Sequence, residues 1–206
     1  GKAERLMPVL ERRTTTALIA CGALAREVLA LRARYGWEAE VLAVPSLLHN
    51  HPDRIPAAVR ERIREARQRF GRVIVVYGDC GTGGELDRLL AAEGVERIAG
   101  PHCYEMYANG RFEHLMAKAP GTFFLTDYLL GSFDHLVVER LGLDRHPELA
   151  ADYFANYTRV VYLAQHPTDE RLAQAGAAAK RLNLPLEIEP VGYGALETRL
   201  VEQMSR

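Results

Sequence analysis

Three cysteines are the residues of this chain whose types and spacing could do chemistry. Cys21 stands in IACGALARE, Cys80 in VVYGDCGTGG and Cys103 in RIAGPHCYE, and each follows a short run that is typical of a β-strand. Thiolates bind metals, and the N–H groups and partial positive charge at the start of a helix lower the pKa of a nearby thiol. We therefore predict a metal site built from Cys21, Cys80 and Cys103.

The residues leave the identity of the metal open. Three thiolates with an open fourth position suit Zn²⁺ with a displaceable water or substrate, and equally a [4Fe–4S] cluster with one iron open for chemistry. The paired C-x-x-C spacing of closed structural zinc modules does not occur in the sequence. We expect a functional site assembled from distant loops, and the alternative is three unrelated buried thiols.

Polar residues and glycines beside the cysteines complete the candidate site. The candidate acid–base residues are Asp79, His49 and His102, although Asp79 could equally cap the following helix. The candidate ligand-binding residues are Gly22, Gly81, Gly83, Gly84, Asn50 and Tyr104. GDCGTGG between a strand and a helix also resembles an anion cradle, so we expect a carboxylate or phosphate group of the substrate to touch this loop.

The elements that must position these residues can be predicted from the hydrophobic pattern. The predicted strands are 15–20, 38–44, 72–77, 96–99, 122–126, 159–164 and 186–191. Apolar residues recur with helical period between them, as at Leu24, Val28 and Leu31. This alternation predicts an α/β fold with a mainly parallel, Rossmann-like sheet of about seven strands flanked by helices. All three cysteines then lie at the carboxyl edge of the sheet, where ligands bind. Two predicted helices in 127–158 leave the strand order there open.

Composition and charge exclude several classes of protein. The 206 residues predict one domain, 1–206, with 1–13 as a peripheral N-terminal segment. Because 26 Lys and Arg oppose 27 Asp and Glu, we expect no nucleic-acid partner and no membrane association. The first residues, GKAERLMPVLERR, lack the apolar core of a signal peptide, and an odd number of cysteines favours reduced thiols. We therefore expect a cytoplasmic protein.

The motifs together resemble a known family. ACGALARE, LLHNHPDRI, YGDCGTGG, GPHCYEM and PGTFFLTDYL are similar to sequences of the family catalogued as domain of unknown function 1638, from about residue 15 to about residue 195. The resemblance implies a cytoplasmic bacterial or archaeal protein encoded near corrinoid-dependent methyl-transfer components. Many members carry His-Asp-Cys where this chain has Pro101, His102 and Cys103. The cysteine matches that pattern, and the histidine is displaced by one position.

These observations lead to one functional hypothesis and two alternatives. We expect a metal- or iron–sulfur-dependent enzyme, a transferase, or an accessory protein of one-carbon metabolism. Its substrate would be a small thiol, carboxylate or methylated compound at the three-cysteine site, and corrinoid or methyltransferase proteins would be its partners. The alternatives are a non-catalytic protein that handles a metal or cofactor and a metal-free module that binds a small molecule.

Overall fold

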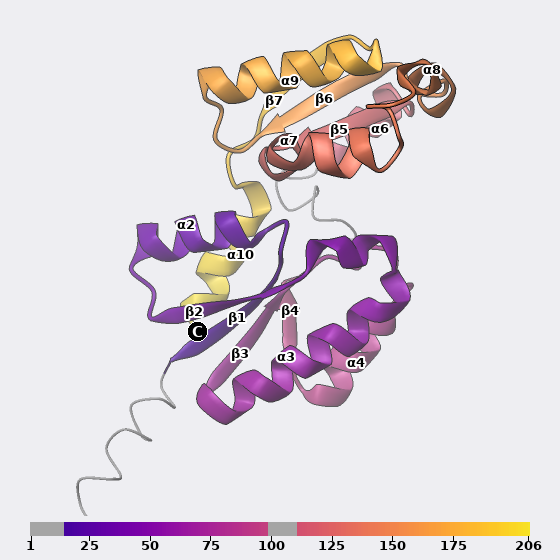
Figure 1. The fold of residues 1–206 in the computed structure, drawn as a ribbon. Helices are drawn as coiled ribbons and strands as arrows, with labels where there is room; N and C mark the ends of the chain where they lie inside the picture. The colour runs from indigo at the N-terminus through magenta and orange to yellow at the C-terminus, as the bar shows by residue number, and fades with distance from the viewer. Residues whose placement is uncertain (1–14, 99–110) are drawn as a thin grey trace, which may run out of the picture. The chain divides into compact units, whose positions relative to one another are not determined.

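The computed structural model describes residues 15–98 and 111–206. The chain divides into two compact units, residues 1–103 with 196–206 and residues 104–195 (Figure 1). Each unit has its own parallel sheet, and we describe the units separately. The predicted peripheral segment, 1–13, lies outside the described residues.

A four-stranded parallel sheet forms the centre of the first unit. Its strands are β1 (Thr16–Cys21), β2 (Ala39–Val44), β3 (Arg72–Val76) and β4 (Glu96–Ile98). Their order is β2-β1-β3-β4, and each neighbouring pair is parallel. All six residues of β1 are buried, which explains why this strand is a nearly continuous apolar run rather than an alternating one.

Helices cover both faces of this sheet. They are α2 (Ala25–Tyr35), α3 (Ile55–Arg69), α4 (Glu85–Glu93) and α10 (Gly194–Met204), with two short 3₁₀ turns after β2, η1 (Ser46–Asn50) and η2 (Pro52–Arg54). Figure 1 shows α3 and α4 against one face and α2 with α10 against the other. Helix α3 buries Ile55, Val59, Ile63 and Ala66, which share one helical face.

Helix α10 joins the first unit although the chain reaches it through the second. Leu196 and Leu200 are fully buried. Arg34 and Tyr35 of α2 both donate to the Glu197 carboxylate, at 3.0 and 2.6 Å. The hydrogen bond between Tyr35 and Glu197 raises the pKa of Tyr35. Arg72 donates to the Gln203 carbonyl at 2.7 Å. The first unit is therefore built from two separate stretches of sequence.

The second unit is built on a three-stranded parallel sheet. Its strands are β5 (Thr122–Thr126), β6 (Arg159–Ala164) and β7 (Leu186–Pro190), in the order β5-β6-β7. Its helical segments are α6 (Arg111–Lys118), α7 (Asp127–Phe133), the π-helical η3 (Asp134–Glu139), η4 (Pro147–Leu149), α8 (Ala150–Tyr153) and α9 (Asp169–Leu182). Val160 and Tyr162 pack in one core with α7 and α9, whereas Val161 and Leu163 pack in another with Leu115 of α6.

The predicted α/β fold with parallel, Rossmann-like sheets is confirmed. The described residues contain seven strands, and each predicted strand boundary lies within one residue of the observed one. The strands are divided between two sheets, four and three, rather than collected in one. Strands β5 and β6 are parallel neighbours, which answers the question of strand order around 127–158. The prediction that 1–206 folds as one domain stays a prediction.

No helix within the described residues is long and apolar enough to cross a membrane.

Candidate functional site

The first sheet has a topological switch point between β1 and β3. From β1 the chain moves to β2 on one side and then returns past β1 to β3 on the other. The loops after β1 and β3 therefore leave the sheet in opposite directions, and in open parallel sheets ligands bind in the crevice between such loops. Cys21 is the last residue of β1, and Cys80 follows the end of β3. The second sheet runs in sequence order and has no such reversal among the described strands.

The loops after β1, β2 and β3 touch one another at this edge. The Gly22 N–H donates to the Val44 carbonyl at 2.8 Å. A Cβ atom on Gly22 would lie 3.1 Å from that carbonyl and from the Ser46 nitrogen, so glycine permits the close approach. A Cβ atom on Gly81 would lie 3.5 Å from Pro52 of η2. The sequence thus brings three loops from three strands into contact.

The turn after β3, which we call the glycine loop (residues 78–84), is held together by Asp79. The Asp79 carboxylate accepts hydrogen bonds from the Thr82 hydroxyl at 2.5 Å and from the Gly83 and Gly84 N–H groups at 3.2 and 3.1 Å. The Thr82 N–H also donates to the Asp79 carbonyl at 3.0 Å. This one side chain therefore satisfies three donors of the loop.

These contacts bear on the predicted anion cradle. Two of the glycine N–H groups that would bind an anionic substrate already bind the chain's own carboxylate. An anion at Gly83 and Gly84 would have to displace Asp79. The hydrogen bond from Thr82 and those from the two glycines hold the pKa of Asp79 below its ordinary value. The Asp79 carboxylate thus stabilises the conformation of the loop, and its predicted role as a catalytic acid or base stays a prediction.

Cys80 has an unusual backbone conformation. Its φ angle is +49°, in the left-handed region that glycine and asparagine adopt more readily than other residues. One other described residue that is not glycine has a positive φ, Asn183, which ends helix α9 as asparagine often does. Cys80 is only 6% exposed and Cys21 is fully buried. Two buried thiols therefore flank the switch point.

The remaining predicted site residues divide into described and undescribed ones. Asn50 is exposed, and its side-chain amide donates to the Leu47 carbonyl at 3.4 Å within its own 3₁₀ turn. His49 lies in the same turn, η1, and its side chain is not described. Cys103, His102 and Tyr104 lie outside the described residues. No group of three or more His, Cys, Asp or Glu side chains placed to hold a metal occurs within 15–98 and 111–206.

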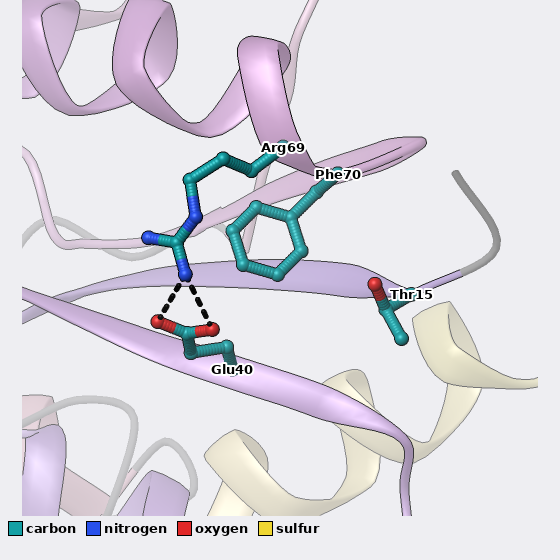
Figure 2. A pocket seen from close by; sticks show the side chains of 4 residues that line it. All are labelled: Thr15, Glu40, Arg69 and Phe70. Carbon is teal, nitrogen blue, oxygen red and sulfur yellow. Dashed lines mark hydrogen bonds and ion pairs between the residues drawn. The ribbon is translucent and has the colours of Figure 1, made fainter. Parts of the chain in front are cut away.

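A hollow of about 440 Å³ lies at the opposite edge of the first sheet. Figure 2 shows its described lining, which is Thr15, Glu40, Arg69 and Phe70. Arg69 reaches both Glu40 carboxylate oxygens, at 3.1 and 3.2 Å, and stacks 5.0 Å from the centre of the Phe70 ring. Thr15 directly precedes β1 and Phe70 lies two residues before β3, so this hollow lies at the amino ends of the strands, away from Cys21 and Cys80. Its charges already neutralise each other.

At the carboxyl edge of the second sheet, a buried network joins the ends of β5 and β6. The Asp127 carboxylate accepts from the Tyr162 hydroxyl and from the His166 N–H, and the Asp127 N–H donates to the Gln165 side chain. Burial and the bond to Asp127 raise the pKa of Tyr162. Thr126 caps α7 by accepting from the Leu129 N–H. We assign this network to the packing of the unit.

Residues 43–200 match the family described as a protein of unknown function (DUF1638). The chain belongs to this family. The DUF1638 match includes Cys80 and Cys103 but begins after Cys21, although the sequence resemblance extended back to about residue 15. No curated protein and no solved structure matches the chain.

Three further residues of this DUF1638 chain belong to the edge but were not predicted. Glu27, in the first turn of α2, is only 3% exposed. It lies three residues after Leu24 and four before Leu31, so the helical period already placed it on the buried face. Thr82 braces Asp79, and Arg97 of β4 donates to the Tyr77 carbonyl at 3.0 Å while binding Asp87 with two nitrogens. The sequence pattern does not indicate which groups Thr82 and Arg97 bind.

Proposed function

We propose that this protein holds a metal ion or an iron–sulfur cluster on Cys21, Cys80 and Cys103. The observation that carries the proposal is the position of Cys80, a buried thiol kept on a left-handed backbone at the switch point. The neighbouring strand ends with Cys21. The need for a metal ligand would explain why a cysteine stands at a position whose backbone conformation favours glycine.

The chemistry of the described residues fits a cation better than an anion. Cys21 ends β1, Cys80 lies in the loop after the neighbouring strand β3, and Asp79 adds a carboxylate beside Cys80. Two N–H groups that could attract an anion are already bound to that carboxylate. Soft sulfur ligands select zinc and iron–sulfur clusters over magnesium or calcium. Cys103 would supply the third thiolate from outside the described residues.

In the proposed site the chain's own residues hold, bury and position the group. Cys21 and Cys80 would ligate the metal ion or cluster. Gly22 and Gly81 allow the loops after β1 and β3 to contact the loop after β2. The burial of both thiols excludes water from that side of the site. The bound group would supply the chemistry, because zinc would keep a thiol substrate in its nucleophilic thiolate form at neutral pH, and a cluster would provide an iron with an open position that acts as a Lewis acid.

The wider role that we propose is in one-carbon metabolism in the cytoplasm. The substrate would be a small thiol, carboxylate or methylated compound, and the partners would be corrinoid or methyltransferase proteins. The protein would act as a metal-dependent transferase or as an accessory protein of one. The support for this role is the sequence resemblance together with the two thiols at a ligand-binding edge.

Elemental analysis of protein purified without oxygen tests the proposal. We expect about one zinc or about four iron atoms per chain. Cys21→Ala, Cys80→Ala and Cys103→Ala should each remove the metal and keep the circular dichroism of the folded protein, because a chain of this length can build its core without a metal. His146→Ala, which changes an exposed histidine of the second unit, is the control and should keep the metal.

Three results would contradict this proposal. They are the absence of both metals, metal that survives all three cysteine substitutions, and a cysteine variant that unfolds, which would make the site structural. With metal present, turnover of methyl donors would identify an enzyme, and its absence would favour a metal-handling protein. Ligand binding by metal-free protein would favour the module that needs no metal.

A further inference from the structure

The backbone at Cys80 has a free-energy cost that the surrounding loop must offset. A residue with a Cβ atom is disfavoured in the left-handed region, and it persists there only where neighbouring contacts determine its conformation. Gly81, Gly83 and Gly84 in the same loop also have positive φ angles, but glycine adopts them freely. Cys80 is therefore the position of the loop that depends on outside support.

That support comes from the residues on either side of Cys80. Asp79 immediately precedes it, and Thr82 follows two residues later. Their side chains are joined by the 2.5 Å hydrogen bond, and their backbones by the bond from the Thr82 N–H to the Asp79 carbonyl. Together they close a ring around Cys80 and Gly81. Thr82 is only 8% exposed, so its hydroxyl is sheltered from competition with water.

We propose that Asp79 and Thr82, the loop clamp, are positioning residues that hold the sulfur of Cys80 in place for ligation. This inference rests on the proposed function. The Asp79 carboxylate points its oxygens at three donors of its own loop, so the clamp acts through Cys80 and not by direct contact with a ligand. Residues that orient a metal ligand in this way commonly change metal affinity by 10–100-fold when they are substituted.

Thr82→Val tests the clamp because it removes the hydroxyl and keeps the shape of the side chain. We expect the affinity of anaerobic, metal-free protein for Co²⁺, measured by the thiolate-to-cobalt absorption band, to fall at least about tenfold. Thr82→Ser restores the hydroxyl and should restore the affinity. Asp79→Asn, which cannot accept from all three donors, should resemble Thr82→Val. Thr168→Val is the matched control, since Thr168 caps α9 in the second unit.

A second readout needs no metal. Iodoacetamide labelling of metal-free protein, resolved by peptide mass spectrometry, reports how often each buried thiol becomes accessible. In Thr82→Val we expect the labelling rate of Cys80 to rise severalfold while that of Cys21 stays at the wild-type value. Thr168→Val should change neither rate.

The two readouts separate the clamp from the proposed function. A wild-type protein that contains neither zinc nor iron after purification without oxygen would contradict the proposed function, and the labelling rates would still decide whether the clamp holds Cys80. An unchanged Cys80 rate in both Thr82→Val and Asp79→Asn would overturn the clamp. An equal rise at Cys80 and Cys21 would also overturn it, because that pattern reports general destabilisation of the unit.

Discussion

At Cys80 the requirements of the backbone and of the side chain conflict. The φ angle of +49° favours glycine, whereas the chain places a buried thiol there. Cys21 lies in a regular strand in which every residue is buried, and its backbone carries no such strain. Removal of the Cys80 thiol should therefore lower the free energy of unfolding less than removal of the Cys21 thiol, although we assign both to the same site.

We expect Cys80→Gly to leave the free energy of unfolding of metal-free protein within about 1 kcal/mol of wild type, because relief of the left-handed backbone offsets the lost burial. Cys21→Gly should lower it by about 2 kcal/mol, since a buried side chain is lost and a glycine enters a strand. Urea unfolding of the two variants under reducing conditions measures both values. Equal losses would show that Cys80 is not strained.

The sequence predicted that Cys21 and Cys80 follow the carboxyl ends of neighbouring strands, because strand periodicity determines where each strand ends, whereas Cys103 lies outside the described residues. It did not predict that Asp79 would bind Gly83 and Gly84, since a carboxylate near a helix start can cap a loop, bind a ligand or transfer a proton. Glu27 could have been found, as it falls on the same helical face as Leu24 and Leu31. The contact of Arg97 with Tyr77 could not, because it depends on strand pairing.

At the scale of elements, close approaches between loops fix how the strands begin. Gly121 precedes β5, and its carbonyl accepts from the Thr158 N–H at 2.7 Å. A Cβ atom there would lie 2.5 Å from the Asn156 carbonyl oxygen. Gly176 lies inside helix α9, and a Cβ atom there would meet nothing within 4 Å. Glycine is therefore sterically required at position 121, whereas nothing around position 176 requires it.

We expect Gly121→Ala to lower the free energy of unfolding of the second unit by about 2–4 kcal/mol, because backbone atoms on both sides must move. Gly176→Ala should raise it by about 0.5–1 kcal/mol, through helix propensity and a less flexible unfolded chain. Thermal and urea unfolding measure both. A neutral Gly121→Ala would mean that the start of β5 can shift without loss of packing.

At the scale of the whole molecule, the strands were predicted correctly but their division between two sheets was not. Hydrophobic patterns identify β4 and β5 equally well as strands, but they do not say whether two strands pair. The return of α10 to the first unit was likewise not predictable. Its buried face, with Leu196 and Leu200, is an ordinary amphipathic pattern that would suit any sheet.

We expect Leu200→Ala to lower the stability of the first unit by about 2–4 kcal/mol, since it leaves a cavity under α10. Hydrogen exchange followed along the full chain should then be faster in β1 and β3 and unchanged in β5 and β6. Equal acceleration in both sheets would show that the two units unfold together, as the single-domain prediction requires.

Because the first unit is built from two separate stretches of sequence, it cannot be completed until the end of the chain has been synthesised on the ribosome. Residues 104–195 form a continuous stretch, so the second unit can fold as soon as they have emerged. The first unit, although synthesised earlier, lacks Leu196 and Leu200 until α10 arrives. The nascent chain must therefore carry β1 and β3 with one sheet face covered by α2 but not yet by α10 while the later unit folds, and that interval is when chaperone binding would matter most.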